Sequence, residues 1–383
     1  MKIKSLSLRN FRNIASADFI FHPKVNLFTG NNAQGKTNLC EAVSVCFGKS
    51  FRGAKPSEIA PFGDDEEKET AIELVFSFDR DLSLENGERE HTLKYLQKKM
   101  SGKLTFNGME MKSAEELYGA LRYTFFIPDD LSIVRGSPDK RRNYLDLIAD
   151  MMNRVHHIKL YEYQKALRQK NNLLIKSNPS APGFSEMLES WNETIAKLGV
   201  NVFCGRVKYF DKLIHYANEY YKLLNQNNEK LSVLYQSSVL GNFLFPYEIK
   251  DASFLLSTYL KKLRESAERE RHMKYTVVGV HRDDLLFRIN GRSAKDFASQ
   301  GQVRSIAVAL KLAEARMIHE RSGDEPIMIL DDVLSELDAF RRSFVINHID
   351  RLQTFITSCT LADLNDLNDG YLWTVENGRF MRM

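Results

Sequence analysis

Residues 25–37 read Val-Asn-Leu-Phe-Thr-Gly-Asn-Asn-Ala-Gln-Gly-Lys-Thr, a short apolar run followed by a glycine-containing polar segment. The apolar run at its start predicts a short β-strand that ends at Thr29–Gly30. Apolar residues between positions 39 and 47 recur at helical spacing, which predicts a helix beginning near Lys36. The sequence therefore predicts a strand, a glycine-rich turn and a helix in succession.

The turn matches the pattern G-x-x-x-x-G-K-[ST] of a phosphate-binding loop. Phosphate needs many hydrogen-bond donors in a small space, and the N–H groups of such a turn and the positive end of the following helix provide them. Lys36 is expected to reach the β- and γ-phosphates of ATP, and the Thr37 hydroxyl is expected to hold Mg²⁺. The expected nucleotide contacts are consecutive: Gly30, Asn31, Asn32, Ala33, Gln34, Gly35, Lys36, Thr37 and Asn38.

A nucleotide site also needs a carboxylate for the metal ion, and residues 327–332 supply two. The run Ile-Met-Ile-Leu-Asp-Asp predicts a buried strand that ends in Asp331 and Asp332, the arrangement of a Walker B element. Asp331 is expected to support Mg²⁺, and Asp332 to orient or deprotonate the attacking water. Alone, an Asp-Asp pair after a strand is usually a helix N-cap, but the phosphate-binding loop favours the catalytic interpretation.

Two further segments narrow the class of site. Ser299, Gln300, Gly301 and Gln302 precede a helix expected over about 302–320, and a Ser-Gly turn at a helix start is a second anion site. Ser335-Glu336-Leu337-Asp338 follows the Walker B acids. Each segment also fits an ordinary helix cap, a capping turn for the first and a variant capping box for the second.

Composition is that of an ordinary globular protein. The 383 residues (44.2 kDa) suggest two domains, with 43% hydrophobic and 27% charged residues. The net charge of +4 permits a nucleic-acid partner without arguing for one. The four cysteines, at 40, 46, 204 and 359, show no metal-ligand spacing. No apolar run approaches the roughly 20 residues of a membrane span, and a signal peptide is not expected, so we expect a cytoplasmic protein.

Strand signals lie toward both ends of the chain, and helical signals fill the middle. Between 139 and 272 glycine is sparse and apolar residues recur every three or four positions, with a break at 177–183 and a short strand near 231–235. The expected fold is therefore α/β, one domain built from 1–138 and 273–383 with a mostly helical arm domain inserted at 139–272. Other expected strands are 71–78, 103–111, 122–127, 275–280, 285–290, 327–330 and 354–357, a helix is expected at 334–348, and hairpin turns at Asn107–Gly108, Asn290–Gly291 and Asn377–Gly378.

The order of the motifs resembles that of ABC-type ATPases. In that group two heads meet face to face, and the signature of one head contacts the γ-phosphate held by the other. Here Ser299–Gln302 corresponds to the signature, and Ser335 and Asp338 to the D-loop. The chain further resembles the RecF family of bacterial recombination and gap-repair proteins, in segments Leu8–Asn13, Gly30–Asn38, Gly48–Arg52, Pro128–Leu131, Val134–Pro138 with Arg141–Arg142, His281–Leu285 and Phe297–Gln302.

Several positions depart from the family pattern. Ala33 replaces a loop glycine, Val280 replaces a proline, and Val303 replaces a polar residue. No histidine follows the 354–357 strand, where Ser358-Cys359-Thr360 lies, and no clear glutamine follows Phe126. We therefore assign no residue to the γ-phosphate-sensing histidine or to the Q-loop.

The resemblance implies a weak ATPase that uses ATP, Mg²⁺ and hydrolysis as a switch. A homodimer formed on ATP binding would clamp double-stranded or gapped DNA at single-strand/double-strand junctions, and would help RecO and RecR to load RecA. The γ-phosphate would join Lys36 of one subunit to the signature of the other, until Asp332 assists hydrolysis. Candidate DNA contacts are Lys49, Arg52, Lys55, Lys140, Arg141 and Arg142, although such charge runs are as often simply solvated.

Other ATPases with related motifs remain as alternatives. An ABC transporter subunit would place the signature nearer the loop and carry the histidine. A chromosome-structuring SMC-like ATPase shares the head but needs far longer arms, since a helix of about 35 residues spans only about 50 Å. A nuclease fusion would need an additional acidic domain. A nucleotide-switched scaffold that binds proteins rather than DNA is the alternative of a different class.

Overall fold

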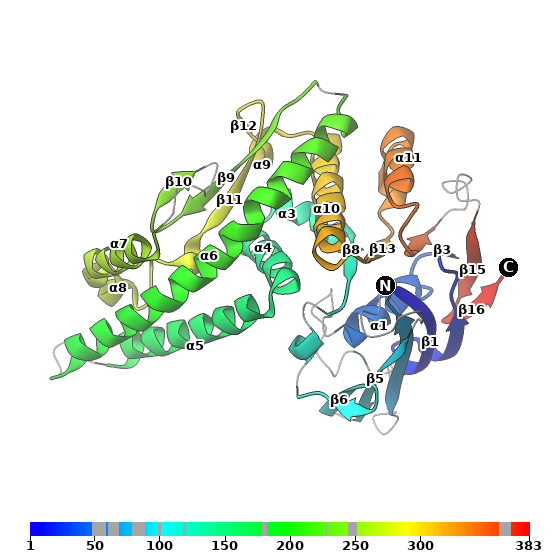
Figure 1. The fold of residues 1–383 in the computed structure, drawn as a ribbon, viewed down its shortest axis with the longest axis horizontal. Coiled ribbons are helices and arrows are strands. Elements are labelled where there is room, and N and C mark those ends of the chain that lie inside the picture. Colours follow the sequence, from blue (N-terminus) through cyan, green and yellow to red (C-terminus); the bar gives the residue numbers. More distant parts are fainter. Residues whose placement is uncertain are drawn as a thin grey trace. The chain divides into compact units, whose positions relative to one another are not determined.

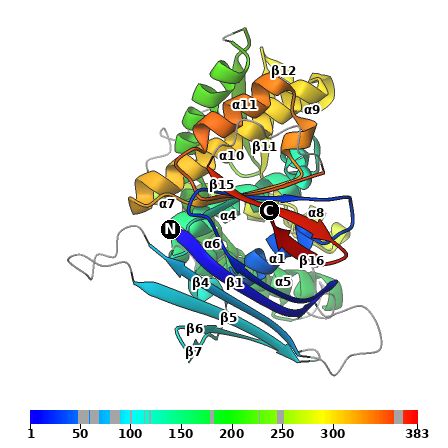
Figure 2. The same ribbon diagram turned by 90° about the vertical axis from the view of Figure 1, so that its right-hand side faces the viewer.

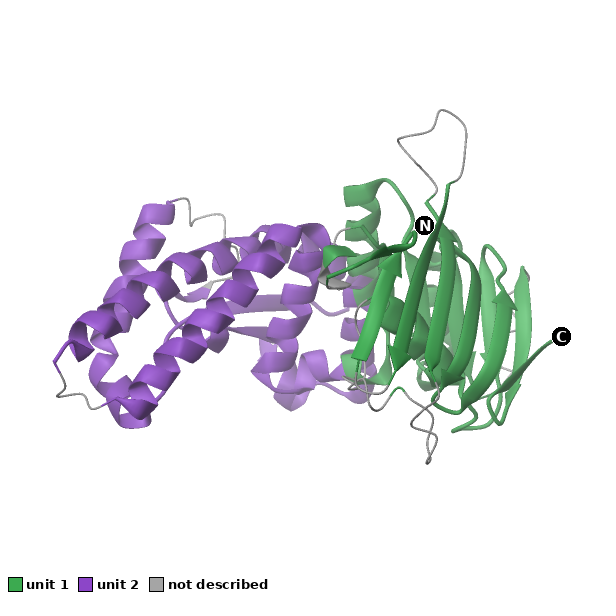
Figure 3. Cartoon of the chain, turned by 90° about the horizontal axis from the view of Figure 1, so that it is seen from below, with its two compact units in different colours: residues 1–130, 311–383 green, residues 131–310 purple. Residues whose placement is uncertain are grey.

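The computed structural model describes residues 1–47, 59, 69–78, 89–98, 101–112, 114–117, 120–177, 182–226, 228–243, 251–359 and 369–383. These residues divide into two compact units (Figure 3). The first unit contains residues 1–130 and 311–383, and the second contains residues 131–310. The second unit is thus an insertion in the sequence of the first.

A largely parallel sheet in the first unit joins strands from both ends of the chain. Its order is β16-β15-β3-β14-β13-β8, and only β16 is antiparallel to its neighbour. Every residue of β13 and β14 is buried, which is typical of parallel strands covered on both faces. The strands span Val25–Thr29 (β3), Tyr123–Phe126 (β8), Ile327–Asp331 (β13), Thr354–Ser358 (β14), Gly370–Glu376 (β15) and Arg379–Arg382 (β16).

The other sheet of the first unit is antiparallel, in the order β2-β1-β4-β5-β6-β7 (Figure 2). Alternate residues of β4, Ile72, Leu74 and Phe76, are fully buried, so one face of this sheet forms core. Helix α1 (Lys36–Cys46) contacts both sheets, and its residues 39–46 are accordingly all buried. The strands span Lys2–Phe11 (β1), Ile14–Ile20 (β2), Thr70–Ser77 (β4), Glu90–Lys98 (β5), Ser101–Phe106 (β6) and Met109–Glu110 (β7).

Three Asn-Gly hairpin turns form where the sequence predicts them. In each, the residues that flank the dipeptide are paired: Phe106 with Met109, Ile289 with Arg292, and Glu376 with Arg379. Both central residues of every turn have positive φ, between 48° and 82°. Asparagine and glycine adopt that conformation at low cost, as a two-residue type I′ hairpin requires.

The helix expected over 334–348 is shorter than predicted. Residues Leu334–Glu336 form a 3₁₀ turn, and helix α11 spans only Ala339–His348. The Asp338 side chain accepts a hydrogen bond of 2.8 Å from the Arg341 backbone N–H, which caps α11 at its start. The cap fixes the break between the two segments.

Helices make up most of the second unit. Asn153 ends α4 and its side chain caps α5, while α5 and the 41-residue helix α6 pack side by side (Figure 1). Helix α10 (Gln300–Ser322) contributes residues to both units. The remaining helices are Ser132–Arg135 (α3), Pro138–Met152 (α4), Arg154–Lys176 (α5), Phe184–Leu224 (α6), Ala252–Glu265 (α7), Ala267–Met273 (α8) and Ala294–Phe297 (α9). None of the helices in the described ranges is both long and apolar enough to span a bilayer.

The second unit also has its own small sheet, in the order β10-β9-β11-β12. The strands are Leu231–Ser237 (β9), Gly241–Phe243 (β10), Asp284–Ile289 (β11) and Arg292–Ser293 (β12). Because β11 pairs with β9 along its whole length, residues after 272 belong to this unit. Its limits, 131–310, are therefore wider than the expected 139–272.

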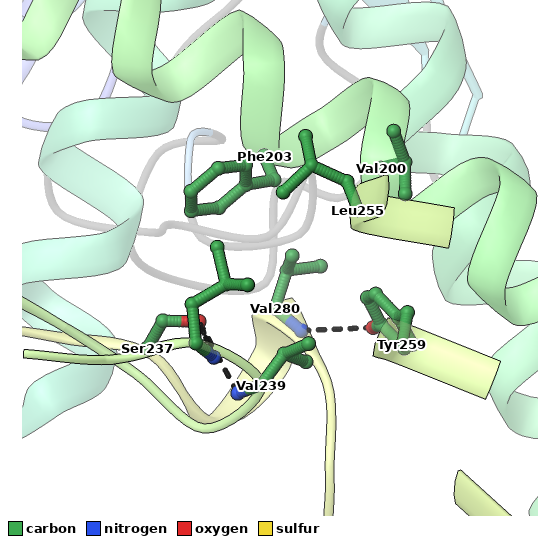
Figure 4. A pocket seen from close by; sticks show the side chains of 8 residues that line it. Val200, Phe203, Ser237, Val239, Leu255, Tyr259 and Val280 are labelled. Atoms are coloured by element: carbon green, nitrogen blue, oxygen red, sulfur yellow. Dashed lines mark hydrogen bonds between the residues drawn. The ribbon is translucent and has the colours of Figure 1, made fainter. Parts of the chain in front are cut away.

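Residues 275–280 form no strand, contrary to the prediction. Four of their backbone N–H groups are bonded to side chains: those of Thr276 and Val277 donate to Asn171 and Glu270, and those of Gly279 and Val280 donate to Ser238 and Tyr259. Figure 4 shows the last of these bonds beside a small apolar pocket. With those donors committed, the segment has no ladder of hydrogen bonds to offer a neighbouring strand.

A buried ion pair fixes the interior of the second unit. Arg206 on α6 donates to both carboxylate oxygens of Asp146 on α4, at 2.7 and 2.8 Å, and to the Val280 carbonyl at 2.7 Å. Burial alone raises the pKa of Asp146, but the charge and hydrogen bonds of Arg206, with a further bond from His156, lower that pKa to about 2.

Replacing Arg206 leaves the Asp146 carboxylate buried without its main partner. We expect Arg206→Met to lower the free energy of unfolding by about 3–5 kcal/mol at pH 7. The pair stabilises the fold above the unfolded carboxyl pKa and loses this contribution as the pH falls toward about 2, so the difference between the proteins shrinks below about pH 4. Urea denaturation followed by circular dichroism measures both effects. The exposed Arg168 on α5 provides the control, since Arg168→Met should change stability by less than about 0.5 kcal/mol; equal losses for both variants contradict this account.

Candidate functional site

The phosphate-binding loop lies between β3 and α1, as the sequence predicts. Three of its residues have positive φ: Gly30 (154°), Ala33 (63°) and Gly35 (116°). Gly35 stands at the N-cap of α1 and no side chain caps this helix, so its first N–H groups point into the loop. The loop residues Asn32–Asn38 and Asp332 line a hollow at this point.

Lys36 lies across this loop and closes it. Its side chain is 6% exposed, and the ammonium donates hydrogen bonds to the carbonyls of Gly30 and of Asn31, the latter at 2.8 Å. The positive charge therefore lies beside the turn whose N–H groups form the proposed anion cradle. An anion bound in the hollow would therefore contact both the Lys36 ammonium and the N–H groups of the loop.

The Walker B strand delivers Asp331 to the start of α1. The Asp331 carboxylate accepts hydrogen bonds from the hydroxyls of Thr37, at 3.0 Å, and Thr357, at 2.8 Å. Asp331 is 4% exposed, and β13 pairs in parallel with β14 so that Asp331 lies beside Thr357. A carboxylate and a hydroxyl brought together beside a phosphate cradle are the oxygen donors that Mg²⁺ takes in nucleotide sites, so these residues fit the expected ion.

Asp332 has a strained backbone and faces the same hollow. Its φ is 55°, unusual for a residue other than glycine, and its N–H donates to the Thr357 carbonyl and hydroxyl. These bonds hold the left-handed conformation, which aims the carboxylate at the loop rather than along the strand. Ser335 donates its hydroxyl to the Asp332 carboxylate at 3.0 Å, so one expected D-loop residue orients the expected catalytic acid, while Asp338 caps α11.

Cys359 occupies the position where the sequence offers no histidine. Its sulfur lies 2.8 Å from the Asn32 side-chain oxygen, 3.7 Å from the Lys36 ammonium and 3.9 Å from the Asp332 carboxylate. Sequence reasoning missed this residue, although its place directly after a strand parallel to β13 is the signal that could have found it. A thiol is a weak hydrogen-bond donor, so it can contact a phosphate oxygen. Unlike an imidazolium, it supplies no positive charge.

Residues from both ends of the chain hold the outer side of the loop. Asn13 donates to the Gln34 carbonyl at 3.2 Å and accepts from Asn38 at 2.8 Å. The turn of the last hairpin adds bonds from the Asn377 N–H to the Gln34 side chain, at 2.6 Å, and from the Gly378 N–H to the Gln34 carbonyl, at 2.9 Å. Gln34 is thus fixed by segments more than 300 positions apart.

The signature turn, Ser299–Gln302, belongs to the second unit. The Ser299 N–H donates to the Gln302 side chain at 2.7 Å, and the Gln302 N–H donates to the Ser299 hydroxyl at 3.2 Å. These reciprocal bonds form a capping box at the start of α10. Ser299 and Gln300 are exposed, and Arg135 on α3 donates to the Ala298 carbonyl just before them. The turn is therefore ordered and open to a partner.

Comparison with known proteins identifies the family. The sequence matches the RecF/RecN/SMC N-terminal domain family over residues 2–377. It is 32% identical over 383 residues to the DNA replication and repair protein RecF of Lachnospira eligens, covering 99% of this chain and 98% of that protein. It is 35% identical over 382 residues to the protein of the same name from Listeria innocua, covering 99% of each. The chain belongs to the RecF family.

Solved structures agree with this assignment. A structure described as the recombination mediator protein RecF with ATP in the RecFOR pathway matches at a TM-score of 0.87 and 30% identity, covering 100% of this chain and 97% of that one. An Smc head bound to the C-terminal winged-helix domain of ScpA matches at a TM-score of 0.57 and 13% identity, covering 100% and 97% of the two chains. The expected fold, an ABC-type ATPase head shared by the RecF and SMC proteins, is confirmed.

The basic residues expected to contact DNA differ in whether the structure describes them and in how exposed they are. Lys49, Arg52 and Lys55 lie outside the described residues. Lys140 is exposed. Arg141 is 3% exposed and makes two bonds to Asp284, at 2.6 and 3.0 Å, while Arg142 is half-buried and donates to the Asp283 carbonyl at 2.8 Å. Burial lowers the pKa of Arg142.

The geometry of Arg141 does not favour the expected contact with DNA. Its guanidinium is committed inside the second unit, to an acid of the RecF-like segment His281–Leu285. A DNA phosphate would have to displace a partly buried two-bond ion pair. Lys140 keeps the exposure that a phosphate contact requires.

Gly30 lies where the phosphate-binding loop packs against the last hairpin, so a substitution there measures how tightly the loop is enclosed. A β-carbon at this position would lie 2.2 Å from the Val375 carbonyl oxygen of the last hairpin. We expect Gly30→Ala to lower the free energy of unfolding by at least about 2 kcal/mol, because backbone must move. The control is Gly108→Ala in the β6–β7 turn, where a β-carbon meets nothing within 4 Å. It should cost about 1 kcal/mol, for the left-handed conformation alone. Thermal denaturation of both variants measures the difference, and equal shifts contradict the enclosure.

Proposed function

We propose that this protein is an ATP-binding switch in DNA replication and repair, as the names of its relatives suggest. The observation that carries the proposal is the contact of Thr37 with Asp331 beside a glycine-rich loop closed by Lys36. This combination provides oxygen donors for a metal ion and a cradle for phosphate in one place. A related solved structure is described with ATP.

ATP with Mg²⁺, when bound, supplies a reactive triphosphate with a metal to neutralise its charge. The loop N–H groups and Lys36 would bind that charge, and Thr37 with Asp331 would hold the ion. Asp332, oriented by the bond from Ser335, would accept at its carboxylate the proton of a water whose oxygen bonds to the γ-phosphorus, while the bond to the leaving ADP breaks. We infer slow hydrolysis that ends a bound state, in keeping with a thiol rather than a histidine at position 359.

We further propose that two copies share each nucleotide. Ser299, which is exposed, and the half-buried Gly301 supply a turn at the start of a helix, which is a site for an anion. In a dimer this turn contacts the γ-phosphate held by Lys36 of the other copy. ATP then favours the dimer because it binds the associated state more tightly than the separate chains.

The dimer grips duplex or gapped DNA at single-strand/double-strand junctions, and acts with RecO and RecR in loading RecA. The similarity to a solved recombination mediator of the RecFOR pathway supports this assignment. Among the described basic residues of the candidate segments, Lys140 has the exposure for a phosphate contact.

ATP-dependent association is the first test. Sedimentation of the wild type with ATP should show a dimer, and ADP should not support it. Lys36→Ala should reduce association at least about tenfold, because it removes charge that holds the phosphates. Ser299→Arg should reduce it to a similar degree by blocking the turn, while leaving nucleotide binding by single chains unchanged. If neither variant weakens the dimer, the shared-site mechanism is wrong.

DNA binding is the second test. The affinity for gapped duplex should be higher with ATP than with ADP, and should fall at least about tenfold between 50 and 200 mM salt if two or more phosphates are contacted. Gel shifts or fluorescence anisotropy on gapped and intact duplexes measure both quantities. Equal binding with ATP, with ADP and without nucleotide contradicts the clamp. A protein that dimerises with ATP yet binds no DNA would instead be a nucleotide-switched scaffold.

A further inference from the structure

The signature turn is held in place by Glu229, a residue outside every sequence motif, which acts on the turn through the side chain of Gln302. The Gln302 side-chain oxygen accepts from the Ser299 N–H, and its NH₂ group donates to the carboxylate of Glu229 at 2.6 Å. The two partners require opposite ends of the amide, since one donates and the other accepts only. The amide of Gln302 is therefore held in a single orientation between the turn and Glu229.

Glu229 is itself fixed by the end of helix α6. Tyr221, which is fully buried, donates its hydroxyl to the second carboxylate oxygen of Glu229. Asn225, the C-cap of the same helix, donates to the Glu229 carbonyl at 3.1 Å. Lys230, the next residue in the sequence, pairs with Asn290 through two hydrogen bonds, of 2.8 and 2.9 Å. Glu229 thus joins the longest helix of the second unit to the signature turn.

The charge distribution suits an anion site. Glu229 carries the negative charge, but the neutral amide of Gln302 stands between that carboxylate and the Ser299 turn. The donated bond stabilises the carboxylate and holds it away from the turn, whose Ser299 and Gln302 N–H groups are bonded within the capping box. A hydrogen bond to an ionised group is about twice as strong as a neutral one, so this contact is well suited to fixing the turn.

We propose that Glu229 is a positioning residue for the signature turn and acts through Gln302. It holds the turn in the geometry that receives the γ-phosphate of a second copy, and it makes that geometry depend on the end of α6. The inference rests on the proposed dimer. Its distinctive consequence is that Glu229 matters only while Gln302 is present.

A double-mutant cycle tests this dependence, with ATP-dependent dimerisation measured by sedimentation. Glu229→Ala and Gln302→Ala should each weaken the dimer about tenfold, the usual effect of removing one charged hydrogen bond. Together they should weaken it no more than Gln302→Ala alone. Glu229→Gln keeps an acceptor oxygen for Gln302 and should stay within about threefold of the wild type.

Two controls separate positioning from general stability. Tyr221→Phe removes the hydroxyl that holds Glu229 without touching the turn; it should weaken the dimer by about threefold, and not at all in the Gln302→Ala background. Glu219→Ala, on a part of α6 where the side chain is 45% exposed, should have no effect. Binding of a fluorescent ATP analogue to single chains should be unchanged in every variant.

The outcomes distinguish the two proposals. If the wild type does not dimerise with ATP, the proposed function fails and this inference fails with it. If the wild type dimerises and Glu229→Ala is equally competent, only the positioning role is wrong. Additive losses in the cycle also overturn it, because Glu229 would then act by a route other than Gln302. If Glu229→Ala does not fold, Tyr221→Phe with Gln302→Ala completes the same cycle and decides the question.

Discussion

The arrangement of the first unit depends on the hydrogen bonds that the Asp331 carboxylate accepts. It accepts hydrogen bonds from Thr37, at the start of α1, and from Thr357, on β14. Both donors can reach it only because β3, β14 and β13 are parallel neighbours, so that their carboxyl ends meet at one edge of the sheet. A buried carboxylate needs such partners, and satisfying it places the phosphate loop, the metal-ligand candidate and Asp332 together.

Local patterns predict much of this fold. The strand before the phosphate loop, the Walker B strand and the three Asn-Gly hairpins all follow from residues that are adjacent in sequence. Residues 275–280 show where prediction from local sequence patterns fails. Their β-branched run is typical of a strand, but Asn171, Tyr259 and other distant side chains take up the backbone donors. Contacts across about 20 to 105 positions cannot be deduced from the composition of six residues.

The site shows the same division between local and distant causes. The nucleotide loop could be predicted because its chemistry lies within eight consecutive residues. Asn13 and Asn377 could not, because each reaches the loop only through the order of strands in the sheets. The burial of Arg141 has a related cause: its charge is visible in the sequence, but its partner Asp284 lies 143 positions away.

The placement of β3 also bears on how the protein is made. Both neighbours of this apolar strand, β14 and β15, come from the last 30 residues of the chain. A ribosome adds about 5–20 residues each second, so β3 emerges and then waits on the order of half a minute before either partner exists. Throughout that interval it has two unpaired edges, the kind of exposed strand that associates with other chains. The yield of folded protein in the cell therefore depends on protection of the nascent chain as well as on the stability of the finished sheet.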